Sequence, residues 1–216
     1  AKTQIKLGLS GRFNVANTLA ALGAVGALGI KLDAAAESLF GFTPVFGRLN
    51  QVSQKPDIYV DFAHTPNALE QTLRLLKQNL PPGGRLISVF GATGERDKNK
   101  RPMMGRISGR LADISIFTSD DTYGEDINQI IDHLVTGTKK TRAKETNPQI
   151  SLSISSLPIY IRQPDRQEAI NLAVKLAVPQ DTILIAGKGH ETMINLGGVD
   201  YPWSDFEAVK KALSQR

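Results

Sequence analysis

The fold of this chain is decided by residues 85–111, which read RLISVFGATGERDKNKRPMMGRISGRL. The segment opens with an apolar run, Arg85 to Phe90, and continues through a loop rich in glycine and charge. It then reaches Pro102, a residue favoured in the first turn of a helix. Apolar side chains follow every four residues, as on the buried face of a helix, at Met103, Ile107 and Leu111. We therefore predict a strand, a polar loop and a helix that starts at Pro102.

The same alternation of apolar strand and amphipathic helix extends from residue 57 to the end of the chain. Further strands are predicted at residues 57–61, 114–117, 159–161 and 182–186. Further helices are predicted at residues 65–80, 126–135, 166–177 and 205–213. Repeated units of this kind predict an α/β fold with a Rossmann-like, mostly parallel sheet and helices on both faces.

Residues 1–44 do not share this alternation and predict a short helical segment. Residues 14–30 predict one helix, whose apolar run Leu19–Ile30 is expected to be buried, and residues 32–39 predict a second. We place a boundary near residue 44 and expect residues 1–44 to be the end of a truncated domain and 45–216 to be the α/β domain. The opening Ala1, without an initiator methionine, fits a fragment.

Composition excludes several classes of function. The 216 residues contain no cysteine, so disulfides, thiolate metal sites and cysteine nucleophiles are excluded. The apolar run at residues 19–30 is shorter than the roughly 20 residues of a membrane span, so we expect a cytoplasmic protein without a membrane partner. A net charge of +5 suggests nucleic acid, but aromatic residues are only 6% and do not alternate with the basic ones. We expect an anion-binding loop at residues 96–101 and a solvated polar connector at 136–150 instead.

Each predicted strand from residue 57 onward, except the weak one at 159–161, ends in a polar loop. These four loops cover residues 61–66, 91–102, 119–126 and 187–191. Taken singly, each is also explained as a turn or a helix cap. A parallel sheet would bring all four to one edge, where ligands of such sheets bind. The chain has no P-loop, dinucleotide fingerprint, serine elbow or zincin motif, so it does not predict a self-sufficient ATPase, dehydrogenase or hydrolase.

In this order, the loops resemble the C-terminal domain of the Mur ligase family, in the branch that adds the third, diamino-acid residue of the peptidoglycan stem. The matching stretches are Asp61–Leu69, Val89–Gly91, Gly94–Lys98, Lys100–Gly105, Asp165–Ile170 and Ala186–Glu191. Gly11–Ala21 is similar to the end of the family's central, ATP-binding domain. The resemblance therefore implies that residues 1–44 are a remnant of that domain.

The resemblance implies ATP-dependent amide formation through an acyl phosphate on UDP-N-acetylmuramoyl-L-alanyl-D-glutamate. The implied partners are that nucleotide, ATP and a diamino acid, with Mg²⁺ bound mainly by the central domain. It implies a hinge at residues 41–48. We expect a monomer that binds no nucleic acid.

The resemblance also implies roles for individual residues, although it assigns neither a catalytic residue nor a metal ligand within this chain. Arg96 would hold the amino-acid carboxylate, Arg101 would support its loop, and Asp120 and Glu191 would hold the amino groups. The same site would include Asp121, Tyr123 and Gly187. The ATP site would include Asn14, Asn17, Arg48, Asp61, His64, Asn67 and Arg166. Lys188 and His190 complete the last motif without an assigned role.

One departure from the family pattern concerns the amino acid. The diaminopimelate-adding members carry Asp-Asn-Pro-Arg where this chain has Asp120–Tyr123, so Tyr123 replaces the arginine that pairs with the second carboxylate. Asp121, Glu125 and Asp126 add negative charge suited to an ammonium group. We predict a preference for L-lysine or another diamino acid without a second carboxylate, with diaminopimelate possible if another arginine reaches the site.

Three alternatives stay open at this point. The first is a related ligase of the cyanophycin or folylpolyglutamate synthetase type. The second is a non-catalytic nucleotide- or anion-binding module. The third is an RNA-binding α/β domain. The sequence alone gives neither the amino acid added nor the oligomeric state.

Overall fold

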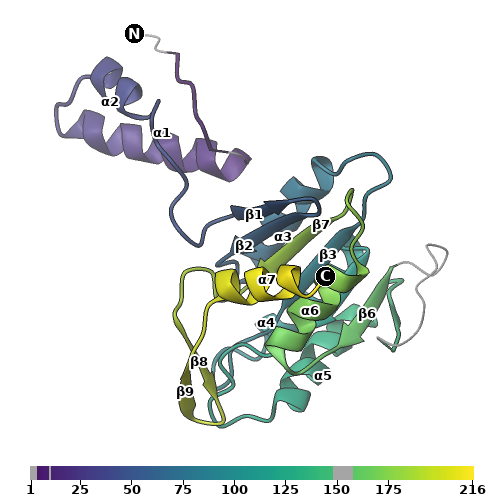
Figure 1. Ribbon diagram of the computed structural model, residues 1–216. Coiled ribbons are helices and arrows are strands. Elements are labelled where there is room, and N and C mark those ends of the chain that lie inside the picture. The colour runs from purple at the N-terminus through teal and green to yellow at the C-terminus, as the bar shows by residue number, and fades with distance from the viewer. Residues whose placement is uncertain (1–3, 10, 148–157) are drawn as a thin grey trace. The chain divides into compact units, whose positions relative to one another are not determined.

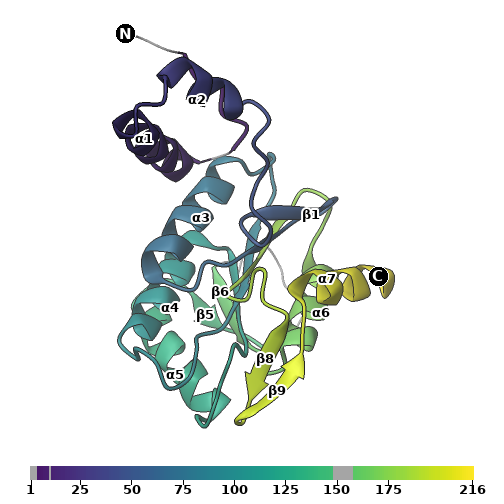
Figure 2. The same ribbon diagram turned by 90° about the vertical axis from the view of Figure 1, so that its left-hand side faces the viewer.

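The computed structural model describes residues 4–9, 11–147 and 158–216. The opening residues 1–3 and the last residues of the predicted connector, 148–150, lie outside the described residues. The chain divides into two compact units, Ala1–Val45 and Phe46–Arg216 (Figures 1 and 2). Each is described by itself.

The first unit contains two helices, α1 (Arg12–Ala27) and α2 (Leu32–Ser38), close to their predicted positions. The expectation that the apolar run at residues 19–30 is buried is wrong for this structure. Leu22 is the buried residue of α1, whereas Leu19 is 61% exposed. The physical reason is that α1 packs in this unit against α2, which has only seven residues. Among the described residues, no helix is long and apolar enough to cross a membrane.

The second unit is built on a sheet, which has seven strands in the described residues. The strands are β1 (Asn50–Gln54), β2 (Asp57–Asp61), β3 (Leu86–Phe90), β4 (Ile114–Phe117), β5 (Lys144–Glu145), β6 (Ile159–Arg162) and β7 (Thr182–Ala186). Their order is β1-β2-β7-β3-β4-β6-β5, and all neighbours are parallel except β1 and β2. The predicted mostly parallel α/β fold is confirmed.

Helices cover both faces of this sheet (Figure 1). One face carries α3 (Pro66–Gln78), α4 (Lys100–Leu111) and α5 (Ile127–Thr138), and the other carries α6 (Arg166–Leu176) and α7 (Asp205–Ser214). Side chains of a strand alternate between the faces, so Leu184 packs in the α3–α5 core while Ile183 and Ile185 pack in the α6–α7 core. Both faces are buried, which explains why the central strands are apolar without alternation.

The start of α4 and the end of α5 differ from the prediction. Helix α4 begins at Lys100, so Pro102 occupies the third helical position. A proline is tolerated there because the first backbone N–H groups of a helix have no acceptor within it. Helix α5 continues to Thr138, into the segment predicted as a connector.

The sequence prediction missed β1, β5 and a hairpin formed by β8 (Met193–Leu196) and β9 (Val199–Pro202). Strand β1 is an antiparallel edge strand of mainly polar residues, and β5 has only two residues, so neither has an apolar pattern. The hairpin had a readable signal, because Gly197 and Gly198 form its two-residue turn with φ of 63° and 84°.

Part of the predicted hinge segment is bonded into the second unit. The ring of Phe46 stacks on that of Phe206 at 4.4 Å, and the Leu49 N–H donates to Asp61 at 2.7 Å. Residues 46–48 of the expected hinge segment 41–48 therefore belong to the second unit.

Strand β7 enters the sheet between β2 and β3, so the loops after β2, β7, β3 and β4 meet at one edge. The loops touch closely at Gly94, whose N–H donates to the Asp121 carbonyl at 2.6 Å. A Cβ at Gly94 would collide with the Thr122 backbone. Glycine is therefore required where the loop after β3 crosses the loop after β4.

Candidate functional site

Lys188 lies at the centre of this edge, directly after β7. Its ammonium is 2.8 Å from Oδ1 of Asp121 and 2.5 Å from Oε2 of Glu191, and the residue is 1% exposed. Oδ1 of Asp121 also accepts the Asn195 N–H at 2.7 Å. Burial alone would lower the pKa of Lys188, but the bonds from Asp121 and Glu191 outweigh it and raise that pKa. Lys188 is therefore a charged link, at neutral pH, between two loops and the hairpin.

A cavity of about 420 Å³ opens beside Lys188. Five of the residues predicted to matter line it together: Asp121, Tyr123, Lys188, His190 and Glu191. The hairpin side adds Thr192, Met193, Asn195 and Asp200, which sequence reasoning missed because it missed the hairpin. With three carboxylates and one ammonium in its wall, the cavity suits a cationic amine.

Arg96 stands beside this cavity. Its guanidinium carbon is 5.9 Å from the ring centre of Tyr123, and its side chain is exposed. Tyr123 adopts a left-handed backbone with φ of 47°, which is uncommon for a residue with a side chain. An exposed guanidinium can grip a carboxylate with two parallel hydrogen bonds.

Arg101, five residues further on, has a different environment. It is fully buried and donates to Glu125 at 2.8 Å, to Nδ1 of His133 at 3.1 Å and to the Thr93 carbonyl at 2.9 Å. The bond from Arg101 lowers the pKa of Glu125 to about 2. Glu125 pairs with Arg101 and does not line the cavity beside Lys188, so the structure does not bring it together with Asp121 and Glu191. His133, a partner on α5, was not singled out in the sequence.

Arg166 was expected near ATP, and the structure shows it bonded to groups inside the protein. It is 2% exposed and pairs with both oxygens of Asp205 at 2.8 Å. It also donates to the carbonyls of Ser119 at 2.8 Å and Ala186 at 2.9 Å. Because all three guanidinium nitrogens are engaged inside the protein, Arg166 ties the ends of β4 and β7 together. Its contact with ATP stays a prediction.

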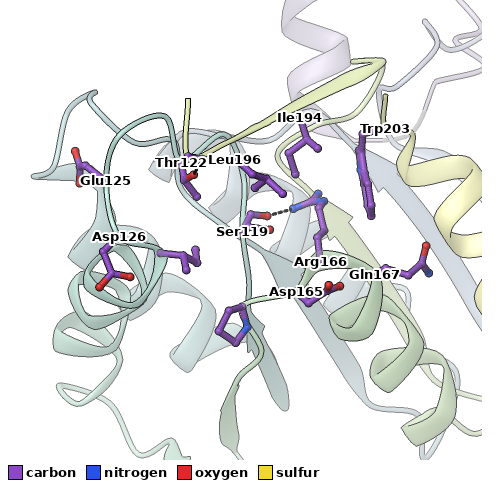
Figure 3. Close-up of a pocket in the computed structure, with 13 residues that line it drawn as sticks. Ser119, Thr122, Glu125, Asp126, Asp165, Arg166, Gln167, Ile194, Leu196 and Trp203 are labelled. Atoms are coloured by element: carbon purple, nitrogen blue, oxygen red, sulfur yellow. Dashed lines mark hydrogen bonds between the residues drawn. The ribbon is translucent and has the colours of Figure 1, made fainter. Parts of the chain in front are cut away.

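A second cavity, of about 520 Å³, lies on the other side of the loop after β4. Figure 3 shows Arg166 in its wall, bonded to Ser119, with Ile194 and Trp203 from the hairpin side. Among the residues that the sequence singled out, Arg166 lines it together with Glu125 and Asp126, the two acids expected to face a substrate ammonium. This loop thus separates two cavities, and Asp121 and Tyr123 line the one beside Lys188.

Asp120 and Gly187 meet between these loops. Asp120 is 4% exposed, and its Oδ1 accepts the Asp121 N–H at 2.7 Å. A Cβ at Gly187, where φ is 112°, would lie 2.6 Å from Oδ2 of Asp120. The absence of a side chain at Gly187 therefore lets the carboxylate of Asp120 approach the end of β7.

Asp61 ends β2 with a buried carboxylate. Its oxygens accept the N–H groups of Leu49 at 2.7 Å and Ala63 at 2.9 Å. Burial raises the pKa of Asp61, and those two bonds oppose the rise without cancelling it. Asp61 shapes the loop that carries the neighbouring predicted residues.

The ring of Phe62 contacts three of the predicted residues, Arg48, His64 and His190, and we call this group the aromatic platform. The ring centre of Phe62 is 4.4 Å from the Arg48 guanidinium carbon, 4.5 Å from the His64 ring and 4.9 Å from the His190 ring. Asn67 is exposed in the first turn of α3, the next element. Ring faces next to a guanidinium suit an aromatic base that carries phosphates. No pattern in the sequence singled out Phe62.

Asn14 and Asn17 belong to the first unit, where Nδ2 of Asn17 is 3.5 Å from Oδ1 of Asn14. Their contact with ATP stays a prediction. Within residues 4–9, 11–147 and 158–216, no three His, Asp or Glu side chains cluster as metal ligands.

The sequence and the fold of this chain are similar to those of known proteins. Residues 47–189 match the family model described as Mur ligase, glutamate ligase domain. The chain is 39% identical over 212 residues to UDP-N-acetylmuramoyl-L-alanyl-D-glutamate–2,6-diaminopimelate ligase of Chromobacterium violaceum, covering 97% of this chain and 40% of that protein. It is 41% identical over 212 residues to the ligase of the same name from Synechocystis, covering 96% and 38%.

A solved structure of a ligase with this name superposes with a TM-score of 0.67 at 32% identity, covering 98% of this chain and 40% of that one. The chain thus spans about two fifths of the length of the curated relatives it matches.

Proposed function

Because this chain belongs to the Mur ligase family, we propose that it is the amino-acid-binding part of an ATP-dependent ligase. The full-length protein would join a diamino acid to UDP-N-acetylmuramoyl-L-alanyl-D-glutamate through an acyl phosphate. In this proposal residues 1–44 end the central ATP-binding domain, and residues 45–216 form the C-terminal domain.

The cavity beside Lys188 is the observation that carries the proposal. Asp121 and Glu191 supply carboxylates for an amino group, and Arg96 supplies a guanidinium for a carboxylate. The two ends of an amino acid need these two kinds of partner, held apart on rigid loops. The proposed role of this chain is to bind and orient the amino acid so that its amine reaches the activated carbonyl carbon.

The platform around Phe62 supports a nucleotide-binding role for the same edge. Arg48 and His64 contact its ring, and the Lys100 ammonium donates to the His64 carbonyl at 3.1 Å. When bound, ATP would supply the phosphoryl group that activates the glutamyl carboxylate. The described residues offer no cluster of metal ligands, so we assign no step to Mg²⁺ within this chain.

The choice of diamino acid depends on the groups around Tyr123. The relatives are named for diaminopimelate, whose second carboxylate needs a cationic partner. Tyr123 offers a hydroxyl, and three carboxylates line the cavity against one lysine. We propose that L-lysine is preferred, with diaminopimelate as the competing substrate that Arg96 would have to hold.

The test is phosphate release by the full-length protein with ATP and the UDP-dipeptide. Phosphate should appear only when a diamino acid is also present, with a higher kcat/KM for L-lysine than for meso-diaminopimelate. A higher value for diaminopimelate overturns the lysine preference and leaves the ligase proposal standing. If neither diamino acid causes phosphate release, the ligase proposal is contradicted. It is also contradicted if phosphate is released with a folate or cyanophycin acceptor in place of the UDP-dipeptide.

A further inference from the structure

Lys188 has no role in the proposed reaction so far, yet it is the most buried cation of the cavity wall. Its side chain is 2% exposed, against 17% for Asp121 and 36% for Glu191. A lysine ammonium loses its hydration when it is buried to this extent, so its two ion pairs must compensate. The two carboxylates fix the position of the ammonium, and the ammonium in turn fixes the positions of the two carboxylates.

The partners of Lys188 come from separate parts of the chain. Asp121 lies in the loop after β4, and Glu191 lies three residues beyond Lys188 in the loop after β7. Through Asp121, the same link reaches the N–H of Asn195 in β8. Without the ammonium, Asp121 and Glu191 would face each other as like charges, which disfavours their common orientation.

We propose that Lys188 is a positioning residue of the amino-acid site, whose ammonium holds Asp121 and Glu191 in the arrangement that receives the substrate's amino group. This inference rests on the proposed function. Glu191 is the more open partner and is the carboxylate that meets the substrate. Lys188 remains charged between two carboxylates, so it acts through them and takes no proton from the attacking amine.

The test is a KM measurement on the full-length protein with Lys188→Met, Lys188→Arg and the control Lys210→Met. Lys210 also pairs with a glutamate three residues away, Glu207, but at an exposed surface of α7. For Lys188→Met we expect the KM for L-lysine and for diaminopimelate to rise about tenfold or more, the equivalent of one lost well-aligned charged contact. The KM for ATP and for the UDP-dipeptide should stay unchanged, and Lys188→Arg should recover part of the loss.

An unchanged amino-acid KM in Lys188→Met overturns the inference while the proposed function stands. A parallel rise of all three KM values with a lower Tm also overturns it, because that pattern marks a general structural role. If Lys188→Met does not fold, Lys188→Arg decides, since a rise in the amino-acid KM alone supports the inference and no rise overturns it. An inactive wild-type protein with every diamino acid contradicts the proposed function itself.

Discussion

Two arginines of the loop after β3, Arg96 and Arg101, show how one residue type serves opposite purposes. Arg101 is fully buried and bonded to Glu125, His133 and a carbonyl, whereas Arg96 is exposed beside the ring of Tyr123. Arg166 resembles Arg101, because it is buried and paired with Asp205. The edge of the sheet therefore has a braced part, which fixes the loops, and an open part, which can meet a ligand.

The largest expected effect comes from breaking the braced part at Arg166. Arg166→Met leaves the Asp205 carboxylate buried without its cation and removes the guanidinium bonds to two carbonyls. We expect the free energy of unfolding to fall by about 3–5 kcal/mol, as for other buried pairs that lose one partner. Urea denaturation of this chain measures it, with Lys210→Met as the exposed control, which should cost less than about 1 kcal/mol. An equal loss of unfolding free energy in the two variants would contradict a stabilising role of the buried Arg166–Asp205 pair.

A smaller effect is expected at the open part. Arg96→Ala should leave the Tm unchanged, because the side chain is exposed. It should raise the KM for the amino acid about 10- to 100-fold, the equivalent of one charge-assisted bidentate contact. Steady-state kinetics of the full-length protein provide the measurement. A lower Tm with an unchanged KM would place Arg96 with the braced arginines.

The smallest effect is a pH dependence at Glu125. Its pKa is lowered from 4.5 to about 2 in the folded protein, so the fold favours the ionised form. The stabilisation is therefore complete above the unfolded pKa and is lost as the pH falls from about 4.5 to about 2. Glu125→Gln should be less stable than the wild type near neutral pH, with a difference that shrinks across this window. Denaturation curves at several pH values test it, and a difference independent of pH would refute it.

The sequence predicted the central strands and helices correctly because each carries an apolar pattern of its own. Strands β3 and β7, for example, are buried at every position, and their residues are nearly all apolar. Strand β1 and the hairpin were missed because they are largely polar and depend on neighbours for their hydrogen bonds. Only the paired glycines Gly197 and Gly198 gave a local signal that was readable in advance.

The sequence likewise predicted one part of the candidate site and not another. Residue types and their order along the chain were enough to nominate Asp121, Glu191 and Arg96 and to suggest the family. They did not distinguish an arginine that faces solvent from one that pairs inside the protein, so the ion pairs of Arg166 with Asp205 and of Arg101 with Glu125 were not predicted. Partner choice depends on contacts between residues far apart in sequence, such as Arg166 with Asp205.

By itself, the sequence determined the α/β layering, the succession of four polar loops and the absence of thiol chemistry, because these follow from local pattern and composition. Only the tertiary structure decided which charges are neutralised. Lys188, Asp121 and Glu191 become one cluster, and Phe62 becomes the platform for Arg48 and His64, only because β7 enters the sheet between β2 and β3. The physical reason is that the energy of a charge depends on its burial and its partners, and the fold sets both.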